Sequence, residues 1–150
     1  MSGPLEELYQ EVILDHSRRP RNRAALTGAT GRATGHNPIC GDRVTVSVKV
    51  EDGRVADVGF EGAGCAISQA AASLMTVSVK GKRVAEARAL CETFHELITG
   101  QELPAADLAQ LGRLCAFAGV TGFPLRVKCA SLPWHALRAA LDQGGAVSTE

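Results

Sequence analysis

The sequence predicts a single α+β domain over residues 1–150, in which a small antiparallel sheet precedes most of the helices. Two runs of β-forming residues flank Asp52-Gly53, and Asp-Gly between two such runs is a strong sign of a β-hairpin. Beyond Cys65 the apolar residues recur at helical spacing instead. Strands gathered in one part of a chain and helices in another are typical of the α+β class.

The N-terminal half is expected to form one helix and then the sheet. Apolar residues at helical spacing predict a helix over residues 5–16, which ends before Pro20. The loop that follows has room for one short strand, over residues 32–35. Valine then occupies every second position of residues 44–50, as in a half-buried strand, and residues 55–60 form the strand that returns from the hairpin.

Helices are expected from Cys65 onward. The segment EGAG breaks the last strand, and a helix rich in small residues begins at or beside Cys65 and ends at Gly81. An irregular lead-in precedes the last helix, which carries Pro133 in its first turn, where a missing N–H removes no helical hydrogen bond. The helices after Gly81 are expected over residues 84–98, 105–118 and 131–143.

Composition narrows the functional classes. The chain carries 16 acidic and 16 basic residues, so it has no excess of positive charge for nucleic acid or an anionic membrane. No apolar run is long enough to span a bilayer, and the N-terminal residues MSGPLEELYQ lack the pattern of a signal peptide. We therefore expect a cytoplasmic protein with reduced thiols. Its five irregularly spaced cysteines do not predict a disulfide framework; cysteines with a special role there usually bind metal or do chemistry.

The five cysteines divide into two groups by their surroundings. Cys91 and Cys115 lie on apolar helical faces and are expected in the core, where a free cysteine packs as a small hydrophobe. Cys40, Cys65 and Cys129 each stand where irregular chain meets a regular element. The last two are expected at helix starts, where the macrodipole lowers the pKa of a thiol, and two basic neighbours add to this effect at Cys129. Thiolate is the form that binds zinc and attacks sulfur.

Asp42 adds a carboxylate to this second group. In extended chain, residues i and i+2 point to the same side, so Cys40 and Asp42 are expected to face one common point. Zinc accepts thiolate and carboxylate ligands in a tetrahedral set, so the three cysteines and Asp42 form a chemically possible site. The spacing lacks a CxxC pair, and a purely structural role for the three cysteines stays open.

The histidines do not extend this set. None stands at ligand spacing from a cysteine, and we expect each of them to be structural or exposed to solvent. They are His16 and His36 in polar, loop-like surroundings, His95 on a helix, and His135 near the start of the last helix. His36 is the one that lies close to Cys40 in the sequence.

Five segments carry a resemblance to a known family. They are LYQEVILDHSRRPRN, HNPICGDRV, FEGAGCAISQAAASLM, GK and RVKCASLPWHAL, and they follow in this order across nearly the whole chain. In this combination the chain resembles the SufU branch of the IscU-like iron–sulfur cluster assembly proteins. The resemblance implies a compact α+β fold with helices packed on a three-stranded antiparallel sheet.

The resemblance also implies a site and an activity. It implies that Cys40, Asp42, Cys65 and Cys129 bind one zinc ion. It further implies a zinc-dependent sulfurtransferase in which Cys40 accepts persulfide sulfur from a SufS-type cysteine desulfurase. That sulfur would then pass to the SufB-containing assembly machinery.

One departure bears on the choice between branches of the family. Scaffold-type IscU proteins carry a histidine immediately before the third cysteine, and this chain has Lys128 there. Lysine is a poor ligand at neutral pH, so the fourth ligand position falls to Asp42, and sulfur relay is favoured over cluster assembly. Two alternatives stay open: a scaffold that builds a [2Fe–2S] cluster on the same ligands, and a zinc-stabilised binding module with structural cysteines.

Overall fold

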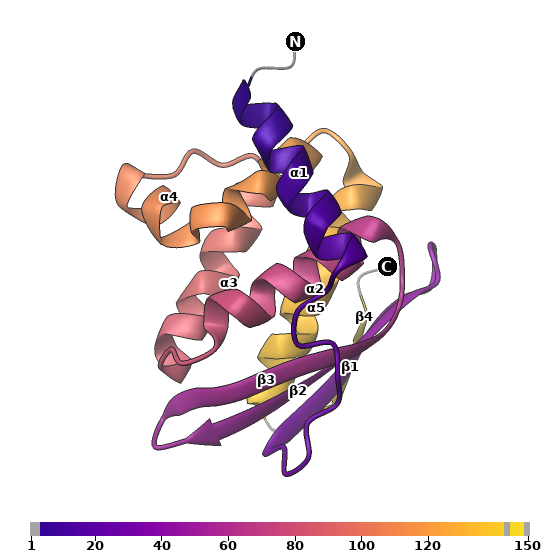
Figure 1. The fold of residues 1–150 in the computed structure, drawn as a ribbon, viewed down its shortest axis with the longest axis vertical. Helices are drawn as coiled ribbons and strands as arrows, with labels where there is room; N and C mark the ends of the chain where they lie inside the picture. The colour runs from indigo at the N-terminus through magenta and orange to yellow at the C-terminus, as the bar shows by residue number, and fades with distance from the viewer. Residues whose placement is uncertain (1–3, 143–144, 149–150) are drawn as a thin grey trace.

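The computed structural model describes residues 4–142 and 145–148, and its helices and strands confirm the α+β class (Figure 1). None of the helices in these residues is long and apolar enough to cross a membrane. The elements, in chain order, are α1 (Pro4–Arg18), β1 (Gly31–Asn37), β2 (Asp42–Glu51), β3 (Arg54–Ala63), α2 (Ala66–Val79), α3 (Val84–Ile98), α4 (Ala105–Leu111), the 3₁₀ helix η1 (Gly112–Val120), α5 (Pro124–Leu141) and β4 (Gly145–Ser148).

The sheet has the predicted three antiparallel strands and one more. Strands β1, β2 and β3 pair in sequence order, and the short strand β4 adds to the free edge of β1 in parallel orientation. The hairpin between β2 and β3 turns through Asp52 and Gly53, which both have positive φ angles, as the Asp-Gly pair predicts. The sheet is therefore fixed by one tight turn and by the longer β1–β2 connection.

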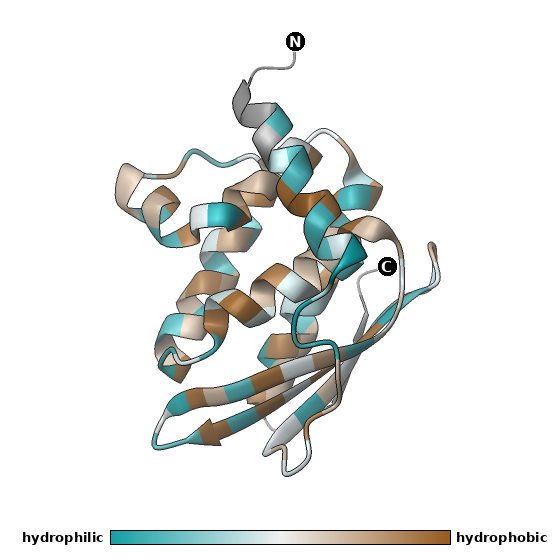
Figure 2. Cartoon of the chain, viewed as in Figure 1, coloured by the Kyte–Doolittle hydropathy of each residue, from teal (hydrophilic) through white to brown (hydrophobic). Residues whose placement is uncertain are grey.

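The helices gather on one face of this sheet, and the core lies between the two layers (Figures 1 and 2). The alternating valines of β2 turn Val44, Val46 and Val48 into this core, where each is fully buried. Strand β1 lies against α5 so closely that a Cβ atom on Gly31 would stand 2.0 Å from the Ala140 carbonyl oxygen. Helix α5 is thus pressed onto the strand that leads into the β1–β2 connection.

Three of the predicted helices agree with the structure, and a fourth ends early. Helix α1 covers the expected residues 5–16 and extends beyond them at both ends. Helix α2 has Cys65 as its N-cap and is followed by Gly81 at a positive φ angle, and α3 spans Val84–Ile98 as expected. The single helix expected over residues 105–118 is instead two helices: α4 ends at Leu111, and η1 begins at Gly112, which has a φ of 54°.

The last helix begins earlier than expected. Helix α5 starts at Pro124, so the predicted irregular lead-in is wrong, and Pro133 lies inside the helix and not in its first turn. Pro124 occupies a first-turn position, where its fixed φ favours a helix start. Cys129 is consequently in the second turn of α5 and not ahead of it. Gln143, where this helix was expected to end, lies outside the described residues.

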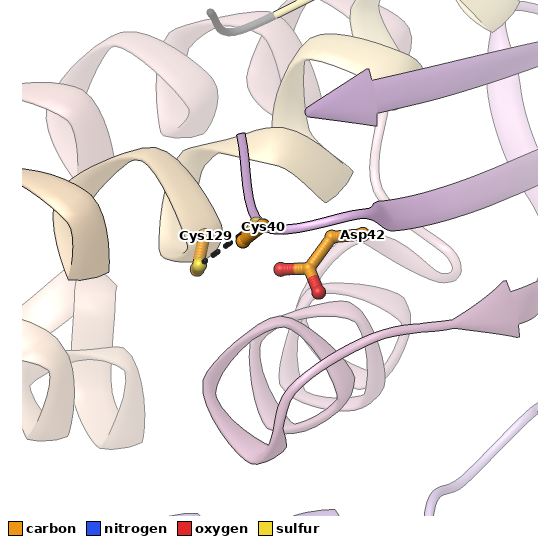
Figure 3. A group of neighbouring side chains, drawn as sticks. All are labelled: Cys40, Asp42 and Cys129. Carbon is orange, nitrogen blue, oxygen red and sulfur yellow. Dashed lines mark hydrogen bonds between the residues drawn. The ribbon is translucent and has the colours of Figure 1, made fainter. Parts of the chain in front are cut away.

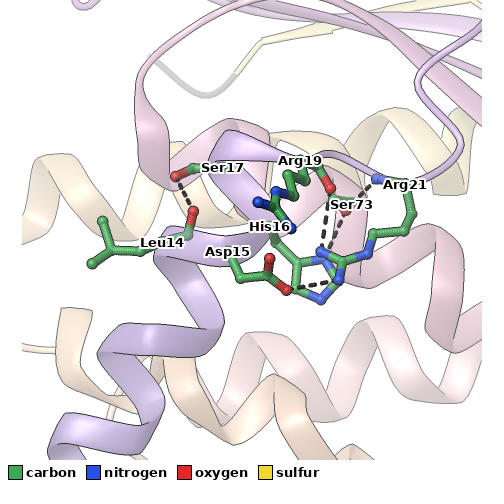
Figure 4. A network of polar contacts seen from close by, with 7 residues as sticks. All are labelled: Leu14, Asp15, His16, Ser17, Arg19, Arg21 and Ser73. Carbon is green, nitrogen blue, oxygen red and sulfur yellow. Dashed lines mark hydrogen bonds and ion pairs between the residues drawn. The ribbon is translucent and has the colours of Figure 1, made fainter.

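A buried polar network ties α1 to α2 (Figure 4). His16, 3% exposed, lies 2.7 Å from the Ser73 hydroxyl through its Nδ1, and the backbone N–H of Arg21 donates to the same hydroxyl at 2.8 Å. The Arg21 side chain in turn pairs with Asp15 at 2.7 Å. His16 is therefore structural, as one of the two expected roles, although it lies in a helix and not in loop-like surroundings.

Candidate metal centre

Cys40 lies in the turn that joins β1 to β2. Asn37 and Asp42 face each other in the β1–β2 register and flank this turn. Gly41 has a φ of 77°, a left-handed conformation that glycine adopts without strain, and its N–H donates to the Asn37 carbonyl at 2.8 Å. Cys40 and Asp42 do converge, but through this turn and not through the extended alternation that the sequence suggested.

Asp42 is the buried carboxylate of the cluster, with a residue exposure of 2%. Its Oδ1 accepts the backbone N–H of Cys65 at 2.9 Å, and its Oδ2 accepts the Cys65 thiol at 3.5 Å. A Cβ atom on Gly64 would stand 2.9 Å from this Oδ1 and 2.3 Å from the Ser68 hydroxyl. The expectation that EGAG breaks the strand is wrong for its first three residues, because β3 continues to Ala63; Gly64 alone follows the strand, and it leaves the space that the carboxylate occupies.

Cys129 faces Cys40 from α5 (Figure 3). The two Sγ atoms lie 3.8 Å apart, and one ligand atom from each of Cys40, Asp42 and Cys129 lies within 4.8 Å of the others. Cys129 is buried, whereas Cys40 is exposed on its turn. The structure thus brings together three of the four ligands that the family resemblance implied.

Cys65 stands beside this group and not within it. Its thiol is at the N-cap of α2, where it accepts the Ser68 N–H at 3.5 Å, and it reaches the group through its contact with Asp42. The expected position at a helix start is correct for Cys65. Its side chain is exposed, unlike those of Asp42 and Cys129.

The expectation that the helix dipole lowers the pKa of Cys129 is wrong. Burial raises the pKa of this thiol, and its hydrogen bonds with Asp42 and Cys65 raise the pKa further. Burial alone would also raise the pKa of Asp42, but hydrogen bonds from the Cys129 and Cys40 thiols and from Cys65 outweigh it and lower the pKa. The metal-free cluster is therefore a carboxylate that accepts hydrogen bonds from thiols.

A metal cation fits this donor set. The ion pairs found among the described side chains do not include Asp42, so its buried charge has only hydrogen bonds to offset it. In tetrahedral coordination, Zn–S bonds of about 2.3 Å and Zn–O bonds of about 2.0–2.2 Å place neighbouring ligand atoms roughly 3.5–3.8 Å apart. The observed separations of 3.8 Å between Cys40 and Cys129 and 3.5 Å between Asp42 and Cys65 match this spacing.

The amino-acid sequence matches the family model of the NifU-like N-terminal domain over residues 8–130. The chain belongs to this family. This assignment agrees with the IscU-like resemblance carried by the five sequence segments. It places the thiol and carboxylate cluster inside the matched region, since its members run from Cys40 to Cys129.

Relatives of this NifU-like domain carry two kinds of name. The chain is 42% identical to the iron–sulfur cluster assembly scaffold protein IscU of Streptococcus pyogenes, over 93% of this chain and 86% of that protein. It is 41% identical to the zinc-dependent sulfurtransferase SufU of Bacillus subtilis, over 94% of this chain and 95% of that protein. Its fold is similar to that of a Fervidobacterium islandicum protein described as a candidate scaffold for the SUF system, with a TM-score of 0.82 and 34% identity over 93% of this chain and 99% of that one.

The remaining cysteines of the NifU-like domain lie away from the cluster. Cys91 is buried, and burial raises its pKa to about 12, which confirms its place in the core. Cys115 is half-buried, packs against the same core and donates to the Leu108 carbonyl at 3.6 Å. Within the described residues, no histidine belongs to the metal-capable group, and His95 and His135 lie with their rings 6.4 Å apart on α3 and α5.

Sequence reasoning missed two features of the structure, one in the Cys40 turn and one outside the cluster. Asn37 is fully buried under the Cys40 turn, and its Oδ1 accepts the Ile39 N–H at 3.1 Å. An asparagine two residues before the N–H that it binds is the signal of an Asx turn, and HNPIC carries it. The second feature is a cavity of about 770 Å³ between α1, the start of α2, η1 and the start of α5, in which the Arg126 guanidinium lies 4.5 Å over the ring of Phe123.

Proposed function

We propose that this protein is a zinc-dependent sulfurtransferase of iron–sulfur cluster assembly. It accepts sulfur on Cys40, as a persulfide, from a SufS-type cysteine desulfurase and relays it to a SufB-containing assembly complex. One observation carries the proposal: an exposed Cys40 thiol on a turn lies 3.8 Å from a buried Cys129 thiol and beside a buried Asp42 carboxylate. The Bacillus subtilis relative, named a zinc-dependent sulfurtransferase, supports it.

The four residues that would hold zinc are Cys40, Asp42, Cys65 and Cys129. When bound, zinc supplies the positive charge that keeps their thiols deprotonated, because thiolate is the form that ligates metal. Asp42 needs no rearrangement for this role, since the Cys65 N–H already fixes its carboxylate. Cys129 is held by a helix that packs on the sheet, so Cys40 is the thiol that a partner protein can reach.

The transfer is a thiol–disulfide exchange that needs no outside oxidant or reductant. The Cys40 thiolate attacks the outer sulfur of the desulfurase persulfide, a new S–S bond forms on Cys40, and the S–S bond of the donor breaks. The desulfurase cysteine leaves as its thiolate. Attack by an acceptor thiolate on the outer sulfur of the Cys40 persulfide then releases Cys40 as a thiolate again.

A single-turnover experiment tests this role. Desulfurase carrying ³⁵S-persulfide is mixed with the zinc-loaded protein, with Cys40→Ala, and with Cys115→Ala as the matched control. We expect label on the unaltered protein and on Cys115→Ala, whose thiol lies outside the cluster, and none on Cys40→Ala. Full labelling of Cys40→Ala with zinc still bound would overturn the proposal.

A second candidate function is a scaffold that assembles a [2Fe–2S] cluster on the same residues. The Streptococcus pyogenes relative, named an IscU scaffold, favours it, and thiolates also ligate iron–sulfur clusters. Lys128 before Cys129 is half-buried and adds no ligand at neutral pH, which argues against it. Anaerobic reconstitution with iron and sulfide decides: a stable visible charge-transfer spectrum, with transfer to an apo-acceptor, would replace sulfur relay by scaffold function.

A further inference from the structure

Asn37 holds the Cys40 turn at several points. It ends β1 and is fully buried. Its Oδ1 accepts the Ile39 N–H at 3.1 Å, its carbonyl accepts the Gly41 N–H at 2.8 Å, and the same carbonyl lies 4.0 Å from the Cys40 Sγ. One side chain and its own backbone therefore set the shape of the turn that presents Cys40.

The side-chain nitrogen of Asn37 differs from its side-chain oxygen in hydrogen bonding. Within the described residues, this buried Nδ2 has no hydrogen-bond partner. Buried donors are nearly always satisfied, because an unpaired one loses its hydration without replacement. An acceptor for Asn37 is therefore expected on the side of β1 that the Asn37 side chain faces.

That side is the surface of α5. Alternate residues of a strand share a face, so Asn37 lies on the same face of β1 as Gly31 and Gly35. A Cβ atom on Gly31 would meet Ala140, and one on Gly35 would meet Leu132, so the strand and α5 run in opposite directions along this contact. Two further strand residues, about 7 Å, correspond to roughly four or five helical residues, which places Asn37 beside the turn of α5 that carries Cys129.

The same turn of α5 lacks a donor. Pro133 has no N–H, so the carbonyl of Cys129, four residues earlier, receives no helical hydrogen bond. The neighbouring carbonyl of Lys128 accepts the Ser131 hydroxyl at 3.1 Å, which shows that side chains serve acceptors in this turn. An acceptor on α5 that lacks its i+4 helical donor and an unpaired donor on β1 thus fall in one place.

We propose that Asn37 is a positioning residue that joins the Cys40 turn to the Cys129 turn of α5. Its Nδ2 donates, through one bridging water, to the Cys129 carbonyl that Pro133 leaves without a helical donor. Through this link Asn37 sets the separation of the Cys40 and Cys129 thiols. Its importance for sulfur transfer rests on the proposed function, but the link itself is a property of this chain.

A double-mutant cycle in zinc affinity tests the link without any desulfurase. Asn37→Ser keeps a side-chain oxygen for the Ile39 N–H but is too short to reach α5, and Pro133→Ala returns an N–H to the Cys129 carbonyl. We expect Asn37→Ser to lower the zinc affinity by about tenfold, the low end for loss of a group that orients a ligand. In the Pro133→Ala background the same change should cost less than about twofold, because the carbonyl no longer needs Asn37.

An equal loss in both backgrounds would overturn the proposal, because a merely structural Asn37 predicts that result. No loss in either background would overturn it too. If Asn37→Ser does not fold, hydrogen exchange of the Asn37 side-chain amide by NMR takes its place. We expect slow exchange in the unaltered protein and clearly faster exchange in Pro133→Ala, and unchanged exchange would refute the link. Because both measurements use the protein alone, failure here leaves the ³⁵S result on Cys40 to be judged separately.

Discussion

The two thiols that meet in the candidate metal centre lie in different kinds of structure. Cys40 is exposed on the turn between β1 and β2, while Cys129 is 4% exposed inside a helix pressed onto the sheet. The Asp42 carboxylate, 2% exposed, belongs with the buried side. The buried Asp42 and Cys129 hold their side chains in fixed positions, whereas the exposed Cys40 thiol is the one that another protein can reach.

Two glycines beside the cluster, Gly41 and Gly64, differ in the same way between exposed and buried surroundings. Gly41 allows the exposed turn to adopt a positive φ angle, and a Cβ atom there would have no neighbour within 4 Å. Gly64 lies on the buried side, and a Cβ atom there would press on the Asp42 carboxylate and the Ser68 hydroxyl. The buried side should consequently tolerate substitution least.

The largest effect is therefore expected for Gly64→Ala. The added methyl group displaces the Asp42 carboxylate, so zinc affinity should fall by about 10–100-fold, as when a group that supports a ligand is lost. A chromogenic chelator in competition with the protein measures this affinity. Gly119→Ala is the matched control, because a Cβ atom there has no neighbour within 4 Å and the residue is outside the cluster. Equal affinity in the two variants would contradict the tight approach at Gly64.

The next largest effect is a difference in stability between variants of the two thiols, measured in the metal-free protein. Cys129→Ala leaves a small cavity and removes a hydrogen bond from Asp42, so it should lower the free energy of unfolding by about 1–3 kcal/mol. Cys40→Ala also removes a hydrogen bond to Asp42, but it leaves no cavity because the side chain is exposed, so the loss should be smaller, about 0.5 kcal/mol. Urea denaturation in the presence of a chelator measures both values. Similar losses for the two variants would mean that Cys40 is as much a part of the folded core as Cys129.

Much of this arrangement was predictable because it depends on local sequence. Asp52-Gly53 forms its hairpin through two adjacent positive φ angles. Helix α3 follows from apolar residues at helical spacing that stop shortly before Gly100. Cys65 was correctly placed at a helix start for the same reason. The convergence of Cys40 and Asp42 was also expected, although the turn that achieves it was not.

The rest depends on contacts between distant parts of the chain. Strand β4 exists by pairing with β1, in the register of Ala33 with Gly145, and no short pattern reports such a partner. The first turn of α5 carries apolar residues that stay exposed, such as Leu125, so its apolar spacing does not mark a buried face. Because the start of α5 was predicted too late in the chain, Cys129 was expected just before the helix, and the pKa of its thiol was expected to be lowered. Packing of α5 on the sheet gives the opposite shift.

The smallest expected effect is on the pH dependence of stability, and it comes from the buried His16. Burial, reinforced by the charge of Arg21 and opposed by Asp15, holds the pKa of His16 below its ordinary value; Arg113 acts in the same direction as Arg21. The unfolded chain therefore takes up a proton on this histidine at a pH, about 6.5, at which the folded protein does not. The stability that neutral His16 contributes is full above that pH and is lost as the pH falls from there through the lower pKa of the folded protein.

This sign is measurable in the metal-free protein, where thiol ligation does not interfere. Urea midpoints at pH 7.5 and pH 5.5 should differ more in the unaltered protein than in His16→Gln, which keeps a polar partner for Ser73 but does not titrate. His135, whose pKa burial also lowers, is present in both proteins and cancels in the comparison. If His16→Gln loses as much stability on acidification as the unaltered protein, the buried His16–Ser73 contact is not what resists protonation, and α1 is held to α2 by the other bonds of the network alone.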